Sequence, residues 1–137
     1  MNIREQLDVA EDLRLSGDYT AAKVKYESIL NNGNQSLPEY GHSLRGLAEI
    51  HRMLENSTDS STFYKKAIEK YEELNHTTGL GYAYLGMGQL NRHQNNSFQA
   101  KENIKESIIR FKESKDNYGL ADAHIELGHI MINEINF

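Results

Sequence analysis

Length, composition and charge restrict the class of protein: 137 residues are enough for one compact array, and 38% hydrophobic with 26% charged residues is typical of a chain that dissolves in water. The absence of cysteine excludes disulfides and thiolate metal sites, and a net charge of -5 disfavours nucleic acid, whose phosphates attract basic proteins. Because no apolar run is long enough to span a membrane and acidic residues interrupt the first turns, we expect neither a membrane partner nor a signal peptide, and a cytoplasmic protein.

Two amphipathic helices are predicted at the start of the chain. Apolar residues at helical spacing indicate a helix over residues 2–16, which Gly17-Asp18 ends. A second run of the same kind indicates a helix over residues 19–30, and the turn-forming segment 31–34 ends it. The pair makes up a first predicted repeat at about residues 2–34.

The third predicted helix has the clearest start signal. Ser36 is a candidate N-cap, Pro38 suits a first helical turn, and Glu39 can complete a capping box. This helix is predicted over residues 38–54, and its partner over residues 60–74.

The remaining chain repeats this second pair of helices. The segment 41–50 returns as residues 81–90 and again as residues 121–130, each time at an offset of forty residues. A fixed period of this size is typical of solenoids, in which each unit buries its apolar face by stacking on its neighbours. The predicted boundaries are about 37–75 for the second repeat, about 77–115 for the third and about 117–134 for an unpaired C-terminal helix. We therefore predict an all-α fold, an α-solenoid of about seven antiparallel helices in a single domain over residues 1–137.

One column of the repeat holds only small residues, namely Ala10, Ala48, Gly88 and Gly128. Helices approach closely only where side chains are small, and glycine inside a helix costs about 1 kcal/mol relative to alanine. The return of glycine at Gly88 and Gly128 predicts that another helix lies close to both positions.

The first unit carries an ordered set of motif residues, which are Ala10, Gly17-Asp18-Tyr19, Ala22, Tyr26 and Ile29. This set resembles the helix–turn–helix signature of the tetratricopeptide repeat family, and the resemblance covers nearly the whole chain. The period is 38 and then 40 residues instead of about 34, and Glu55 and Asn95 stand where a turn glycine is expected. The longer form resembles the extended repeats of bacterial regulators and cell-polarity adaptors. Forty residues is also a HEAT-repeat length, which the ordered motif residues disfavour.

The resemblance implies a binding site. In that family the first helix of each repeat lines a concave groove that binds peptides or helices. The groove-facing candidates in this chain are Arg14, Arg45, Arg52, Tyr82, Gln89, Arg92 and His129.

Three of these candidates occupy one column of the repeat, namely Arg14, Arg52 and Arg92. A ladder of guanidinium groups can grip the carboxylates of an acidic peptide by bidentate hydrogen bonds. The alternative is pairing within each helix, since a glutamate precedes two of the arginines by three residues, at Glu11 and Glu49. Gln89 precedes Arg92 and cannot pair ionically, which makes Arg92 the strongest single candidate.

The six histidines do not form a metal-site pattern. Glu126 and His129 have the spacing that puts a carboxylate and an imidazole on one helical face, but a di-iron bundle needs a second copy, which the other repeats do not supply. We expect the remaining histidines considered, His51, His76 and His93, at the surface or in the groove, and His124 as partly buried. No phosphate loop, zinc spacing or nucleophile elbow is present, so we expect no catalytic site, metal or cofactor.

The last predicted helix leaves apolar residues without cover. Terminal repeats normally present a polar outer face, yet this helix ends the chain with many apolar side chains. Because such a patch marks an interface, we predict self-association or partner binding over residues 125–137. The residues that we expect to contribute are Ile125, Met131, Ile132, Ile135 and Phe137.

Solenoids mostly bind other molecules, and the sequence contains no arrangement that suggests an enzyme. We therefore expect a non-enzymatic scaffold or adaptor that binds a protein, through an acidic peptide or a helix in the groove, and forms homo-oligomers through its C-terminal helix. The alternative left open is a small regulatory receptor that senses a short peptide or a small ligand.

Overall fold

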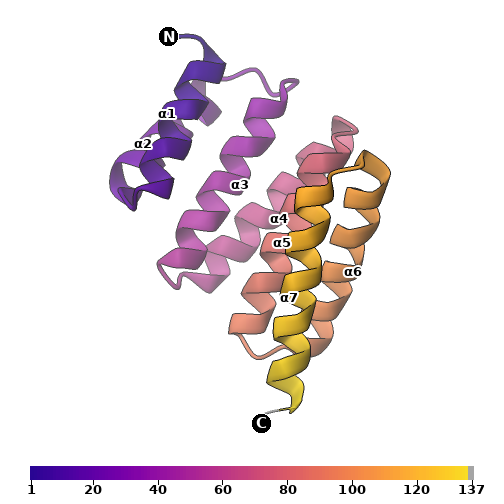
Figure 1. Ribbon diagram of the computed structural model, residues 1–137. Coiled ribbons are helices and arrows are strands. Elements are labelled where there is room, and N and C mark those ends of the chain that lie inside the picture. Colours follow the sequence, from indigo (N-terminus) through magenta and orange to yellow (C-terminus); the bar gives the residue numbers. More distant parts are fainter. Residues whose placement is uncertain (136–137) are drawn as a thin grey trace. The chain divides into compact units, whose positions relative to one another are not determined.

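The computed structural model describes residues 1–135, which form seven α-helices and no strand (Figure 1). The helices are α1 (Ile3–Leu15), α2 (Tyr19–Asn32), α3 (Pro38–Met53), α4 (Ser57–Glu73), α5 (Thr77–His93), α6 (Ser97–Ser114) and α7 (Asn117–Ile135). Over this part of the chain, the predicted all-α class and the predicted number of helices are confirmed. The expected interface residue Phe137 lies outside the described residues.

Contacts between helices divide the chain into two compact units, Met1–Leu74 and Asn75–Phe137. The sequence predicts one domain, and the division falls between its second and third predicted repeats. Unit 1 therefore contains α1 to α4, and unit 2 contains α5 to α7.

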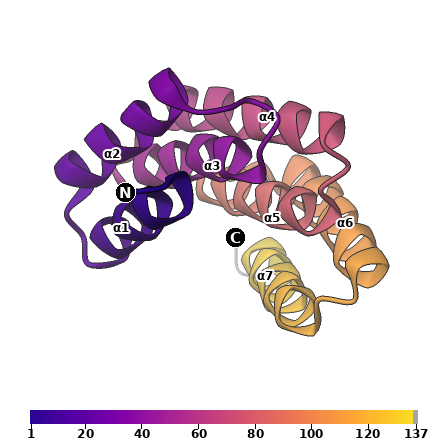
Figure 2. The same ribbon diagram turned by 90° about the horizontal axis from the view of Figure 1, so that it is seen from above.

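In unit 1 each helix packs on its neighbours. Helix α1 contacts α2 and α3, and α3 contacts α2 and α4. Figure 2 shows α1 and α3 side by side, so the first helices of the two repeats form one layer and the second helices lie behind them. The buried core includes Leu7, Ala10, Ala22, Tyr26, Ile29, Leu47 and Ile50.

In unit 2 helix α6 contacts both α5 and α7, and α5 also contacts α7. The core consists of Leu85, Ala100, Ile104, Phe111, Ala123 and Ile130. Helix α7 buries one face against the preceding pair, through Gly119, Ala123, Glu126 and Ile130. In both units, successive helices therefore pack on one another in the manner of an all-α repeat solenoid.

The turn inside each repeat has the same backbone geometry with or without glycine. Gly17, Glu55 and Asn95 follow α1, α3 and α5, and their φ angles are 87°, 63° and 59°. In each turn the next N–H bonds back to a carbonyl five residues earlier, as in a Schellman motif. The bonds run from Asp18 to Leu13 at 2.9 Å, from Asn56 to His51 at 2.8 Å and from Asn96 to Asn91 at 2.9 Å. The departures from the glycine pattern therefore leave the turn unchanged but place two L-residues in the left-handed region.

Side chains cap the starts of α5 and α7, whereas the capping interaction predicted at Ser36 is wrong. The ring Nδ1 of His76 and the carboxylate of Asp116 each accept a backbone N–H at 2.9 Å, at the starts of α5 and α7. The predicted capping box at Ser36 does not form, because the Ser36 hydroxyl donates to Asn34 at 2.6 Å and Leu37 precedes the helix without a side-chain cap. Pro38 occupies the first turn of α3 as predicted.

Small residues lie where a second helix presents a large side chain. A Cβ on Gly88 would lie 2.5 Å from Cδ1 of Ile104, and one on Gly81 would lie 2.5 Å from Cε1 of Phe111. The predicted close approach is therefore confirmed at Gly88. It is wrong at Gly128, where a Cβ would meet nothing within 4 Å, because none of the described residues covers that side of α7.

Candidate functional site

The arginines of the repeat column in unit 1 are paired within the protein. Nη2 of Arg14 bonds to the carboxylate of Glu11, and Nη2 of Arg52 bonds to that of Glu49 at 2.5 Å. Each Nε also donates to a tyrosine of the following helix, at 3.0 Å to Tyr26 and at 3.2 Å to Tyr64. The structure thus has the pairing within each helix that the sequence left open as the alternative to a ligand ladder.

The group formed by Arg52, Glu49 and Tyr64 has no net charge at neutral pH. Burial opposes the ionisation of Glu49, but the charges of Arg52 and Arg45, with hydrogen bonds from Arg52 and Tyr64, outweigh burial and hold the pKa of Glu49 below its usual value. Burial, followed by the Glu49 charge, raises the pKa of Tyr64. Glu49 is therefore a carboxylate and Tyr64 a neutral phenol, and the guanidinium of Arg52 is already neutralised.

The third arginine of the column has a partner that sequence reasoning missed. Arg92 forms two hydrogen bonds with Glu126 of α7, one from Nε to Oε2 and one from Nη2 to Oε1 at 3.4 Å. Glu126 is only 4% exposed. The sequence holds a signal for this pair. In the third repeat, Gln89 and Ile104 replace the glutamate and tyrosine of the earlier repeats, and in α7 Glu126 stands where α3 has Gly46.

The other groove candidates are each engaged within their own unit or lie at its surface. In unit 1, Arg45 is half-buried, and its Nε lies 3.5 Å from the hydroxyl of Tyr71. In unit 2, Tyr82 packs edge-on against Phe111 with ring centroids 4.8 Å apart, Gln89 is half-buried and His129 is exposed. In unit 1 the charge of Arg45 also interacts with Glu49 and Glu11, the carboxylates that pair with Arg52 and Arg14.

Two expectations about histidines are wrong. His51 is only 8% exposed, because its ring stacks on Phe63 of α4 at 5.5 Å and meets the Asn56 side chain at 3.4 Å. His124 is exposed, since it lies on the side of α7 that faces away from α5 and α6.

No metal-binding cluster of three or more His, Cys, Asp or Glu occurs among residues 1–135. Glu126, considered together with His129 as a ligand pair, is bound to Arg92 instead. In the described part of the chain, no helix combines the length and apolar character that a membrane span requires.

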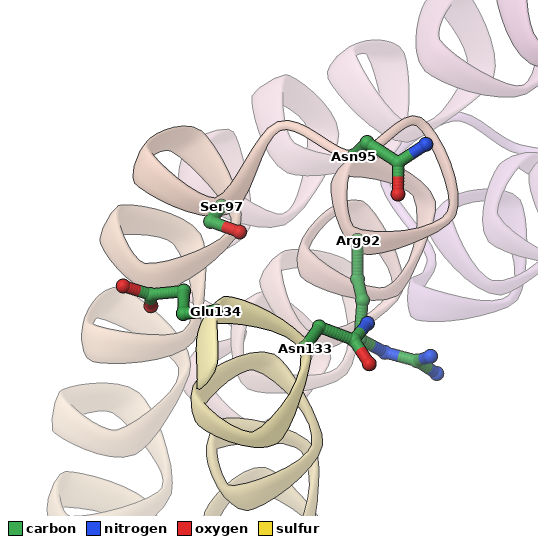
Figure 3. A pocket seen from close by; sticks show the side chains of 5 residues that line it. All are labelled: Arg92, Asn95, Ser97, Asn133 and Glu134. Carbon is green, nitrogen blue, oxygen red and sulfur yellow. The ribbon is translucent and has the colours of Figure 1, made fainter. Parts of the chain in front are cut away.

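A pocket of about 650 Å³ lies in unit 2 between the end of α5, the start of α6 and the end of α7. It is lined by Arg92, Asn95, Ser97, Asn133 and Glu134. Figure 3 shows that the guanidinium of Arg92 extends past Asn133, whereas the carboxylate of Glu134 points away from it. Glu134 pairs with Lys101 of α6 at 2.8 Å. The pocket is thus lined with hydrogen-bonding side chains.

The remaining candidate surface is the uncovered face of α7, formed by Ala121, Ile125, Gly128, Met131, Ile132 and Ile135. Four of these side chains are large, apolar and exposed, with exposed fractions of 58% for Ile125, 53% for Met131, 54% for Ile132 and 79% for Ile135. Of the five interface residues predicted from sequence, these four are brought to one side of α7.

The repeat register explains why this face is open. Equivalent positions of α3 and α5 contact the second helix of their own repeat. In α3, Gly41 and Arg45 meet Tyr71, His51 stacks on Phe63 and Arg52 bonds to Tyr64. In α5, Gly81 meets Phe111, Gly88 meets Ile104 and Asn91 bonds to Asn103. Forty residues after the three α5 positions, α7 presents Ala121, Gly128 and Met131, and Ile132 follows eighty residues after Arg52 of α3. The uncovered face is therefore the side of a first helix that its own second helix covers in the other repeats.

No protein-family model matches this chain, and no curated protein matches its sequence. The resemblance to tetratricopeptide repeats accordingly depends on this chain's own residues and their spacing.

Proposed function

We propose that the protein is a non-enzymatic protein-interaction module, built of tetratricopeptide-like repeats, that receives a helix on the uncovered face of α7. The observation that carries the proposal is the exposure of Ile125, Met131, Ile132 and Ile135, of which the first three stand on columns that contact a second helix elsewhere in the chain. A cytoplasmic location remains part of the same proposal.

Burial supplies the driving force. Covering an exposed isoleucine or methionine contributes roughly 1.5–3 kcal/mol per side chain, so a helix that covers several of them gains enough to offset its ordering. An exposed set of large apolar side chains on one side of a helix is typical of an interaction surface. The arginine column adds little support for an acidic ligand, because Arg14, Arg52 and Arg92 already hold carboxylates.

The chain itself indicates which helix fits. Helix α6 covers the corresponding face of α5 with Ala100 and Ile104 above Gly88, and with Phe111 above Gly81. A helix with small, aliphatic, small and large residues at the spacing found in α6 would place its large side chains over the small residues Ala121 and Gly128, as α6 does over Gly81 and Gly88.

A peptide with the sequence of residues 97–114 is the direct probe. We expect saturable binding when it is titrated onto the fluorescently labelled protein at low protein concentration, with a gain of helical circular dichroism. Ile132→Glu should abolish binding. Ile109→Glu, the same change at an exposed isoleucine of α6 away from this face, should not. Absence of saturable binding at millimolar peptide, or equal loss with both variants, would contradict the proposed function.

A second candidate function, a receptor for a small polar ligand, is favoured by one observation. The pocket beside Arg92 has about 650 Å³, within the usual size range of ligand sites. Its test is thermal stabilisation by a ligand library that Asn133→Leu removes, and a flat response across the library would exclude this candidate.

A further inference from the structure

We infer that the helix received on the uncovered face of α7 is α7 of a second copy of this chain, packed antiparallel in a two-fold symmetric dimer. This inference rests on the proposed function and names its partner. Three observations on the described residues support it.

The first observation is that α7 carries the pattern of the covering helix. The face of α6 that packs on α5 is formed by Ala100, Ile104, Ser107 and Phe111, in the order small, aliphatic, small, large. The uncovered face of α7 has the same order at the same spacing, with Ala121, Ile125, Gly128 and Ile132. Helix α7 therefore presents the surface that receives a helix and also the surface that covers one.

The second observation is the register of the antiparallel contact between α5 and α6. In that contact Phe111 lies over Gly81, and Ile104 lies over Gly88. Transferred to two α7 helices, the same register puts Ile132 of one copy over Ala121 of the other.

The transferred register also puts Ile125 of one copy over Gly128 of the other. Each of these contacts occurs twice in the dimer. If Ile125 of the first copy lies over Gly128 of the second, the two-fold axis also puts Ile125 of the second copy over Gly128 of the first. Self-complementarity of this kind is what an isologous dimer interface requires. Each large side chain then meets a small one, and the open space over Gly128 is filled.

The third observation is charge. The chain carries a net charge of -5, so two copies repel each other over most of their surfaces. The six residues of the uncovered face carry no acidic side chain, and His124, which is exposed on the same side of α7, adds no negative charge. Glu126, the carboxylate buried on the opposite side of α7, is neutralised by Arg92. This face is therefore a surface on which two copies can approach without bringing carboxylates together.

Sedimentation equilibrium of the full chain tests the inference. We expect a concentration-dependent dimer at tens of micromolar protein. Because Ile132→Glu buries a carboxylate against an apolar surface, we expect it to raise the dissociation constant by about a hundredfold or more, with unchanged helical circular dichroism. Ile109→Glu is the matched control and should leave the dimer intact.

A mixing experiment tests the register. Ala121→Lys and Ile132→Glu should each weaken the homodimer, but a mixture of the two variants should form a heterodimer, because the lysine of one chain then faces the glutamate of the other. The double variant Ala121→Lys with Ile132→Glu separates the two orientations: the antiparallel register pairs lysine with glutamate at both contacts and should keep the dimer, whereas a parallel arrangement would put lysine beside lysine and glutamate beside glutamate and abolish it.

Each outcome distinguishes the inference from the proposed function. A chain that is monomeric at hundreds of micromolar yet binds the peptide of residues 97–114 overturns the second-copy inference and leaves the interaction module in place. A dimer that persists in Ile132→Glu also overturns the inference. A monomer that binds no peptide overturns both.

Discussion

Arg92 of α5 and Glu126 of α7 form an ion pair that joins two helices across the core of unit 2, thirty-four residues apart in sequence. In unit 1 the equivalent space beside the arginine column is filled differently, because the ring of Tyr26 lies against Gly46 of the following first helix. In unit 2 the same two positions hold Ile104 and Glu126. In unit 2 the partner of the arginine Nε is therefore a carboxylate on α7, whereas in unit 1 it is a phenol on the second helix of the same repeat.

Removing the charge of Glu126 should destabilise unit 2. Glu126→Gln leaves the partly buried guanidinium of Arg92 without its counter-ion, and we expect a loss of about 2 kcal/mol in the free energy of unfolding. Urea unfolding followed by circular dichroism measures it. Glu134→Gln breaks the more exposed pair with Lys101 and should cost no more than about 1 kcal/mol. Equal losses in the two variants would contradict the structural importance of the Arg92–Glu126 pair.

Two glycines in unit 2 should respond oppositely to alanine. Gly81→Ala puts a methyl group against the buried ring of Phe111, so we expect destabilisation despite the better helix propensity. Gly128→Ala meets no neighbouring atom and should stabilise by up to about 1 kcal/mol. Thermal unfolding on an Ile132→Glu background, in which the uncovered face does not associate, measures both changes. Stabilisation by both alanines would show that Phe111 does not pack closely on Gly81.

The left-handed turn positions provide a third prediction. Glu55 has a φ of 63°, which costs an L-residue free energy that glycine does not lose. We expect Glu55→Gly to stabilise unit 1 by roughly 0.5–1 kcal/mol, after the greater chain entropy of glycine in the unfolded state is subtracted. Gly17→Ala, at a φ of 87° with open space around it, should destabilise by about 1 kcal/mol. The midpoint of urea unfolding decides the sign of each change, and a destabilised Glu55→Gly would contradict this account of the turn.

The lowered pKa of Glu49 predicts a dependence of stability on pH. Because its pKa is lower in the folded state than in the unfolded state, its contribution is fully present above the unfolded value of about 4.3 and is lost as the pH falls through the folded value. Glu49→Gln should therefore lower stability near neutral pH by about 2 kcal/mol, and the difference from the unmodified chain should shrink in acid.

Unfolding midpoints measured from neutral pH to about pH 3 test this dependence on Glu49. Glu72→Gln, at an exposed position of α4, should follow the unmodified chain to within about 0.5 kcal/mol at every pH. A difference for Glu49→Gln that is constant with pH would rule out titration of Glu49 as its source.

Much of the fold can be predicted from local pattern. The helices, their approximate ends and the turn at Gly17 follow from apolar spacing and turn-forming residues, which act within a few residues of each other. The return of the same pattern at an offset of forty residues also predicts correctly that Gly88 faces a neighbouring helix. Ile125 and Ile132 could be assigned to one side of the last helix for the same reason, since helical periodicity is local.

The candidate site required the tertiary structure. Sequence spacing favoured Arg92 as a ligand-binding residue, but its partner Glu126 is on another helix and could be identified only once α5 and α7 were packed together. The same holds for His51, whose burial depends on Phe63 of α4, and for Gly128, whose open surroundings depend on no described helix lying over it. The sequence by itself thus determined which residues share a helix and a face, because helical geometry is local. Only the tertiary structure decided which faces are covered and which charges are neutralised, because both depend on atoms that distant parts of the chain bring into contact.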